Sequence, residues 1–214
     1  MKNLIVILFF LIGVNAFSQI DTKKIESLCF DYHNVERKSV SAILRGYSLT
    51  CQKSADLQTE YLVKNYKDGI CLHDQLVYTN GKIYKTEQDR YDLFNKDSVK
   101  YVGSNKKASL FDYDGEIALK ISGVTLKVDS TNNDYLAKEI IKWFKYSRGH
   151  YHAMTLNPFY DDMVKGAFSV KVNIKSTANG YVTFDLYCVA VFESSMSSDI
   201  YDYKNKKWVN NKGG

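Results

Sequence analysis

The sequence predicts an α+β fold in a single domain, and two observations support this prediction. Segments with the apolar spacing of amphipathic helices occupy much of the chain before residue 160, whereas the last part alternates as paired strands do. Asn179-Gly180 separates the two alternating runs and is typical of a tight hairpin turn. Each run has one apolar face that helices must cover, and helices separate from an antiparallel sheet define the α+β class.

Two helices are expected in the first part of the chain. One runs from Asp21 to about Lys38 and the other from about Leu49 to Tyr66, because apolar residues recur in both at intervals of three and four. The recurring residues are Ile25, Leu28, Cys29, Tyr32 and Val35 in the first segment, and Cys51, Ala55, Leu62 and Tyr66 in the second.

Two further helices are expected before the hairpin. One runs from about Asn133 to Tyr146, and a short one begins near Arg148 and stops before Pro158, because a residue that precedes proline avoids the helical region. The apolar positions of the longer helix are Leu136, Ile140, Trp143 and Phe144.

Strands are expected on both sides of this helix pair. The stretches "GEIALKIS" and "VTLKV" are short extended candidates that come before it. The hairpin strands follow it, each with one apolar face. These faces consist of Phe168, Val170, Val172 and Ile174 in one strand, and of Val182, Phe184, Leu186, Cys188, Ala190 and Phe192 in the other.

Two polar segments are expected to lie outside this core. Residues 76–112 contain a hairpin signal at Asn80-Gly81 and otherwise scattered aromatic and charged residues, which predicts an irregular insertion on the surface. Residues 193–214 are predicted to form a polar C-terminal tail.

The N-terminus has the pattern of a secretory signal peptide. Lys2 precedes an apolar run of eleven residues from Leu4 to Val14, and the small residues Ala16 and Ser18 follow it. Because a membrane-spanning helix needs about 20 apolar residues, the run favours cleavage after Ser18 over an anchor. We therefore expect a secreted or periplasmic protein that is not an integral membrane protein after cleavage of residues 1–18.

The formal net charge of +5 at pH 7 and the pI of about 8.8 describe a mildly basic chain without clustered lysine or arginine. A nucleic-acid groove is therefore not expected, since such domains show clustered basic residues and a pI above about 9.

Four cysteines leave the disulfide state open. Cys29, Cys51, Cys71 and Cys188 permit two bridges with three connectivities in an exported chain, and buried free thiols are an equal alternative. Cys51 and Cys71 should not pair, because the predicted helix between them separates its ends by more than about 20 Å. A disulfide needs Cα atoms within about 7 Å.

A series of motifs then follows in a characteristic order. "HNVER" at residues 33–37, where His33 and Arg37 share a helix face and are expected to form a surface pair, precedes "SADLQTEYL" and His73. Gly115-Glu116 opens a strand. The motifs "IIKWFKYS", "RGHYHAMTLNPFYDDMVKGAFSV" and "AVF" complete the order. Over about residues 25–192 the chain resembles the CAP superfamily (the SCP domain of cysteine-rich secretory, antigen 5 and pathogenesis-related proteins), and most closely its bacterial exported branch.

The resemblance implies an αβα sandwich in which helices flank a central antiparallel sheet beside a cleft lined by histidine and acidic residues. By motif position, the cleft histidines are His73 and His150, and the strand glutamate is Glu116. Tyr146 stands where the family often has a second glutamate, and His152 has no counterpart.

His73, His150 and Glu116 together suit a divalent metal such as zinc with one position left open, or alternatively a polar cluster without metal. Ser147 lies near His150, but no G-x-S-x-G motif accompanies it. The expected function is a non-catalytic binding or interaction module for a lipid, a cell-surface component or another protein. The alternatives are a metal-assisted hydrolase that uses the same cleft and a purely structural secreted domain.

Overall fold

The structure is a computed structural model. It describes residues 20–67, 71–75, 86–95, 98–100, 107–109, 111–127, 133–156, 164–195, 199–202 and 207–210. The predicted signal peptide (residues 1–18), the Asn80-Gly81 hairpin signal and Pro158 lie outside the described residues.

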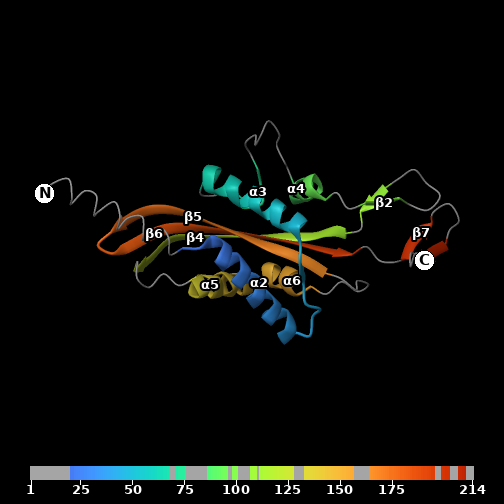
Figure 1. Ribbon diagram of the computed structural model, residues 1–214, viewed down its shortest axis with the longest axis horizontal. Helices are drawn as coiled ribbons and strands as arrows, with labels where there is room; N and C mark the ends of the chain where they lie inside the picture. The colour runs from blue at the N-terminus through green and yellow to red at the C-terminus, as the bar shows by residue number, and fades with distance from the viewer. Residues whose placement is uncertain are drawn as a thin grey trace.

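The described chain folds into three layers, with a four-stranded sheet between two layers of helices (Figure 1). The elements are α2 (Thr22–Ser39), β1 (Gly46–Tyr47), α3 (Leu49–Asn65), α4 (Glu87–Phe94), β2 (Ser98–Lys100), β3 (Lys107–Ser109), β4 (Phe111–Lys127), α5 (Asn133–Tyr146), α6 (Arg148–Thr155), β5 (Val164–Ala178), β6 (Tyr181–Ser195), β7 (Asp199–Asp202) and β8 (Lys207–Asn210). Helices α2, α5 and α6 cover one face of the sheet, and α3 and α4 lie on the other. The predicted αβα sandwich is confirmed.

The sheet has the strand order β1-β5-β6-β4. Its three long strands are antiparallel as predicted, whereas the two-residue strand β1 runs parallel to β5 and makes the sheet mixed. Strands β2–β3 and β7–β8 form two separate small sheets. Among the described strands, β4 pairs with β6 alone, so it forms one edge of the main sheet.

The hairpin between β5 and β6 is confirmed together with its turn. Asn179 and Gly180 both have positive φ, at 53° and 77°, as a two-residue hairpin turn of the primed type requires. The alternation that predicted the strands has a simple origin, since successive side chains of a strand point to opposite faces.

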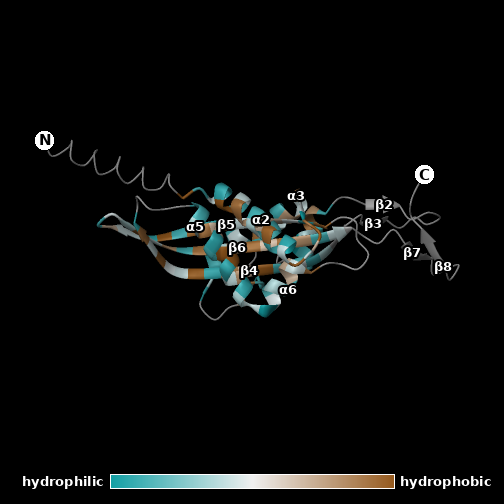
Figure 2. Cartoon of the chain, turned by 90° about the horizontal axis from the view of Figure 1, so that it is seen from below, coloured by the Kyte–Doolittle hydropathy of each residue, from teal (hydrophilic) through white to brown (hydrophobic). Residues whose placement is uncertain are grey.

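Both faces of the hairpin are buried at its centre. The predicted apolar face packs on α2, α5 and α6, with Phe168, Phe184 and Phe192 at most 1% exposed. The opposite face packs on α3 and α4 through smaller residues, among them Ala167 and Val189. Figure 2 shows the resulting alternation of hydrophobic and hydrophilic residues along the strands.

The stretches "GEIALKIS" and "VTLKV" belong to one strand, β4, and not to two. A register shift between Ile121 and Val124 accommodates Gly123, whose φ is 64°. The backbone N–H of Gly123 donates to Oδ1 of Asp185 at 3.0 Å. This bond to the neighbouring strand stabilises the bulge, so the strand continues through the glycine.

Two expectations on burial were wrong. His33 and Arg37 are fully buried and do not form a surface pair, because α2 lies between the loop after it, α6 and the sheet. Nε of Arg37 donates to the carbonyl of Ile43 at 2.6 Å, and Nη1 donates to those of Met154 and Leu156. These carbonyl groups replace the hydration that the guanidinium loses on burial.

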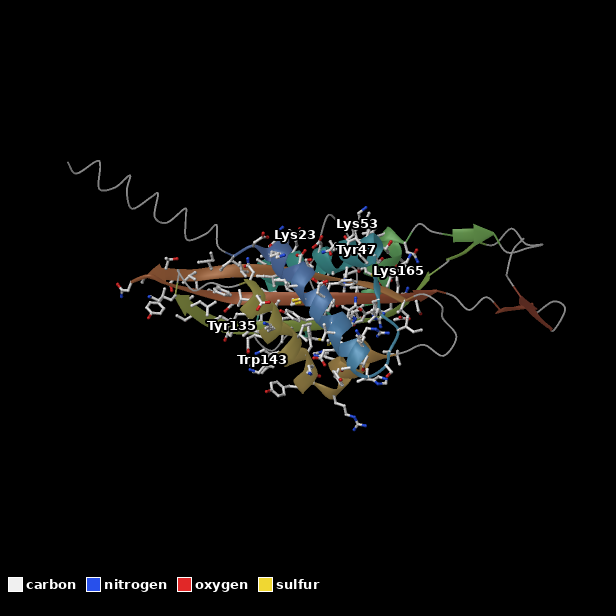
Figure 3. The ribbon with its side chains drawn as sticks, turned by 60° about the horizontal axis from the view of Figure 1, so that its bottom comes forward. Lys23, Tyr47, Lys53, Tyr135, Trp143 and Lys165 are labelled. Carbon is white, nitrogen blue, oxygen red and sulfur yellow. The ribbon has the colours of Figure 1, made fainter. Side chains whose placement is uncertain are left out.

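Trp143, one of the apolar positions that predicted α5, is 48% exposed, and Tyr135 on the same helix is 49% exposed (Figure 3). The second wrong expectation concerns the segment at residues 76–112. Part of the polar segment is not irregular, because α4 forms within it and buries Arg90 and Tyr91 completely. The hydroxyl of Tyr91 donates to the buried Glu193 at 2.6 Å, which fixes α4 to β6.

All four cysteines are free thiols, three of them buried and Cys71 exposed. The expectation that Cys51 and Cys71 do not pair is therefore confirmed. Burial raises the pKa of Cys29, Cys51 and Cys188, which keeps these three thiols protonated. Among the helices that the structure describes, none has the length and apolar character to cross a membrane.

Candidate functional site

The structure brings two of the predicted site residues into contact. Nδ1 of His73 lies 3.0 Å from Oε1 of Glu116, although 43 residues separate them in the chain. Glu116 lies on β4 and faces the α3 side of the sheet, as its even-numbered neighbour Ala118 does. His73 lies in the short turn that follows α3.

Buried glutamines hold that turn in place. Nε2 of Gln58, on α3, donates to the carbonyl of Leu72 at 2.6 Å, and Nε2 of Gln75 donates to Oε1 of Gln58 at 3.0 Å. Both glutamines are at most 3% exposed. The residues on either side of His73 are therefore fixed to α3, and the imidazole is fixed opposite β4.

Arg90 is the main partner of Glu116. Its Nη2 donates to both carboxylate oxygens, at 2.8 and 2.9 Å, and both side chains are fully buried. Because a buried charge is costly unless it is paired, the guanidinium compensates the burial of this carboxylate. Nδ1 of His73 lies against an oxygen of the same carboxylate, which can accept a hydrogen bond from a protonated Nδ1.

Glu87 adds a second carboxylate on the solvent side. Its Oε1 lies 3.5 Å from Nδ1 of His73, and its side chain is 34% exposed. The position of Glu87 follows from the start of α4, where Thr86 and Asp89 form a reciprocal capping box. We call His73, Glu87, Arg90 and Glu116 the His73 site.

The carboxylates change the protonation of their neighbours. The hydrogen bond with Glu116 raises the pKa of His73, and the charges of Glu116 and Glu87 add to this effect against the opposing effect of burial. Burial raises the pKa of nearby Tyr113, and both glutamates raise it further, so this phenol stays protonated. His73 therefore favours its protonated form more than an ordinary histidine does.

His150 lies apart from the His73 site. It is half-buried on α6, edge-on to Phe144 with the ring centroids 5.5 Å apart. Burial lowers its pKa, and the charge of His73 lowers it further, so the two imidazoles interact electrostatically. In the described part of the chain, the donor atoms that lie within 4.8 Å of one another belong to His73, Glu87 and Glu116 and not to His150.

Tyr146 and His152 lie elsewhere. Tyr146 is 72% exposed, and its ring packs edge-on against Trp143 at 6.0 Å. It lines a groove of about 420 Å³ between α2 and α5, on the other side of the sheet from Glu116. His152 is exposed on α6.

Ser147 has a structural role that accounts for its position beside His150. It is the N-cap of α6, where its hydroxyl accepts a hydrogen bond from the backbone N–H of His150 at 3.4 Å. The nearness of the serine to the histidine in sequence thus reflects helix capping, and the hydroxyl contacts backbone and not imidazole.

The His73 site offers one imidazole and two carboxylates to a metal ion. This donor set is of the kind that zinc accepts, and the donor atoms lie close enough together. However, Arg90 already binds both oxygens of Glu116, and a metal there would lie beside a guanidinium that repels it. The set therefore fits a hydrogen-bonded ionic cluster better than a strong metal site.

Sequence reasoning missed Glu87 and Arg90 because both lie in the segment predicted as a surface insertion. A local signal was present, since "TEQD" at residues 86–89 is a capping-box pattern that starts a helix.

No protein-family model matches the chain, and no curated protein or solved structure matches it either.

Proposed function

We propose that the chain is an exported binding or interaction module with a CAP-like fold and that its ligand binds at the His73 site. The observation that carries the proposal is the 3.0 Å contact between His73 and Glu116, two residues that the family resemblance expects in one cleft. The order of the elements and the three layers support the same assignment. The predicted signal peptide of residues 1–18 supports export.

The chemistry of the site favours binding over catalysis. Nδ1 of His73 is occupied by carboxylates, and Glu116 is occupied by Arg90. The raised pKa of His73 favours the imidazolium, in which Nε2 carries a proton and can donate to a ligand. The ligand is thus a lipid, a cell-surface component or a protein that presents a hydrogen-bond acceptor to this nitrogen.

Native mass spectrometry of the natively purified protein tests the proposal. The wild-type chain should carry a small molecule or capture one from an extract, and His73→Ala should lose it. His152→Ala is the matched control, because His152 is an exposed histidine on α6 outside the site. Equal retention by wild type and His73→Ala would place the ligand elsewhere and overturn the proposal.

A metal-assisted hydrolase is the second candidate, favoured by the three donor atoms within 4.8 Å. Zinc titration separates the two functions. The hydrolase predicts heat of zinc binding that a His73→Ala/His150→Ala variant lacks, together with a peptidase or esterase activity that a chelator removes. Identical zinc heats from wild type and variant would exclude a metal at these histidines.

A further inference from the structure

Among the described residues, α3 and α4 cover one end of the α3 side of the sheet. Under α3 and α4 the strands present small buried residues, among them Ala118 and Val189. α3 ends at Asn65, and the ring of Tyr66 packs against that of Tyr187 with the centroids 6.1 Å apart. Beyond this contact the β5–β6 hairpin continues past the end of α3 (Figure 1).

The side chains that follow on this face are known from the strand register. Lys120, Tyr187 and Lys171 lie opposite one another on β4, β6 and β5. Successive residues of a strand point to alternate sides, and the bulges at Gly123 and Lys175 shift this alternation by one residue, so Thr125 and Lys127 share the face of Lys120. We call the following set the basic face: Lys120, Lys127, Lys171, Lys175, Asn173, Asp185, Thr125 and Thr183.

The basic face carries four lysines and one aspartate, which leaves a formal charge of +3 on three adjacent strands. Nζ of Lys120 lies 4.3 Å from the centroid of the Tyr66 ring. Lys175 is the bulge residue of β5, and its Nζ lies 3.1 Å from Oδ2 of Asp185. This contact shows that Lys175 points to the same side of the sheet as Asp185. A chain of net charge +5 thus has a concentration of lysines on one face of the sheet.

The groups between the lysines determine which anionic partner fits. The hydroxyls of Thr125 and Thr183 lie 2.9 Å apart across the strands, and Asn173 lies opposite Asp185. Hydroxyl and amide groups beside cationic groups suit a ligand that bears hydroxyls as well as negative charges. Among the exposed large hydrophobic side chains that the structure describes, Tyr181 alone lies at this end of the face. Proteins that bind membrane surfaces insert several apolar or aromatic side chains, so a lipid surface fits the basic face less well.

From this combination we propose that the basic face binds an acidic polysaccharide, a chain of sugars that bears carboxylates. An extended polymer would lie along the strands, where the lysines attract its carboxylates and the threonines and Asn173 bond its hydroxyls. The proposal does not depend on the His73 site. Glu116 lies four residues from Lys120 along β4, which corresponds to about 13 Å.

The test uses the full chain and an alginate oligosaccharide, a polymer of uronic acids, with neutral dextran as the comparison. The triple variant Lys127→Gln/Lys171→Gln/Lys175→Gln should bind alginate about tenfold more weakly than wild type, or not at all. Raising NaCl from about 0.1 M to about 1 M should also weaken wild-type binding, because the screening length shrinks from about 10 Å to about 3 Å. Dextran should not bind.

Three further variants make the result specific. The control Lys138→Gln/Lys142→Gln/Lys145→Gln removes the same charge from α5, on the opposite side of the sheet, and should keep wild-type affinity. Arginine at positions 127, 171 and 175 should restore binding, since the charge returns. His73→Ala should bind alginate normally, which separates this surface from the proposed function.

Equal losses in the basic-face and α5 triple variants would show that only total charge matters and would overturn the proposal. Binding to vesicles of phosphatidylcholine and phosphatidylglycerol without binding to alginate would also overturn the proposal, because the partner would then be a lipid surface.

Discussion

Nη2 of Arg90 binds both carboxylate oxygens of Glu116, at 2.8 and 2.9 Å, and this fully buried pair joins α4 to the edge strand β4. The contact has two consequences. It anchors a helix from an otherwise polar segment against the sheet, and it holds the Glu116 carboxylate opposite His73. Stability and the chemistry of the site therefore depend on the same ion pair.

The first prediction is that removing Arg90 destabilises the fold strongly. Arg90→Met should lower the free energy of unfolding by about 3–5 kcal/mol, because it leaves the buried carboxylate of Glu116 without its cation. Urea denaturation of wild type and variant measures this difference.

The double variant Arg90→Met/Glu116→Leu is the control for that prediction. It removes both charges and should recover most of the loss, since an apolar pair carries no desolvation penalty. If the single variant lost less than about 1 kcal/mol, as is usual for surface ion pairs, the pair would not be buried in solution.

The second prediction concerns the pKa of His73, which should exceed its ordinary value of 6.5. Glu116→Gln should lower this pKa the most, because the hydrogen bond with Glu116 is the largest favourable contribution, and Glu87→Gln should lower it less. NMR titration of the ring protons measures all three proteins. A pKa that does not respond to Glu116→Gln would contradict the contact.

The raised pKa also determines a pH dependence with a definite sign. A histidine whose pKa is higher in the folded state contributes stability that is fully present below about pH 6.5 and is lost as the pH rises through the folded value. Ligand binding through a protonated Nε2 should decline over the same interval.

The sequence was sufficient for the elements with strong local signals. The helix at Asn133–Tyr146 is confirmed with its predicted bounds, and the hairpin follows from alternation and the Asn179-Gly180 turn. These features depend on periodicity and turn residues, both of which lie in the sequence itself.

The remaining features depend on long-range partners that no local pattern contains. Arg37 is buried because carbonyl groups of Met154 and Leu156, more than 100 residues away, accept its hydrogen bonds. Arg90 is buried because the carboxylate of Glu116, on β4, accepts its hydrogen bonds. Charged residues in a polar context resemble surface residues until the partner is known, and for that reason both were assigned to the surface.

The third prediction is acid destabilisation through His33. The ring is fully buried and stacks on Phe192 with the centroids 5.2 Å apart. Burial lowers its pKa well below 6.5, and the charges of Arg45 and Arg37 lower it further. Below about pH 6.5 the imidazole of His33 is therefore protonated in the unfolded chain but stays neutral in the folded chain. The free energy of unfolding then falls as the pH drops, by up to about 1.4 kcal/mol per pH unit.

His33→Phe tests this prediction, because it keeps a ring against Phe192 and removes the titrating group. Urea midpoints between pH 7 and pH 5 should fall more steeply for wild type than for the variant. Parallel curves would show that other groups cause the acid sensitivity, since His73 is present in both proteins.

The fourth prediction contrasts two glycines that differ in backbone conformation and not in available space. Neither has an atom within 4 Å of the position that a Cβ would occupy, but Gly180 has a φ of 77° in the hairpin turn, whereas Gly149 lies in helix α6. Gly180→Ala should cost about 1–2 kcal/mol of stability, because an L-residue is strained in the left-handed region. Gly149→Ala should stabilise the protein by up to about 1 kcal/mol, because alanine loses less backbone entropy in a helix. Thermal unfolding of the two variants measures both signs, and a stabilising Gly180→Ala would mean that the turn adopts another conformation in solution.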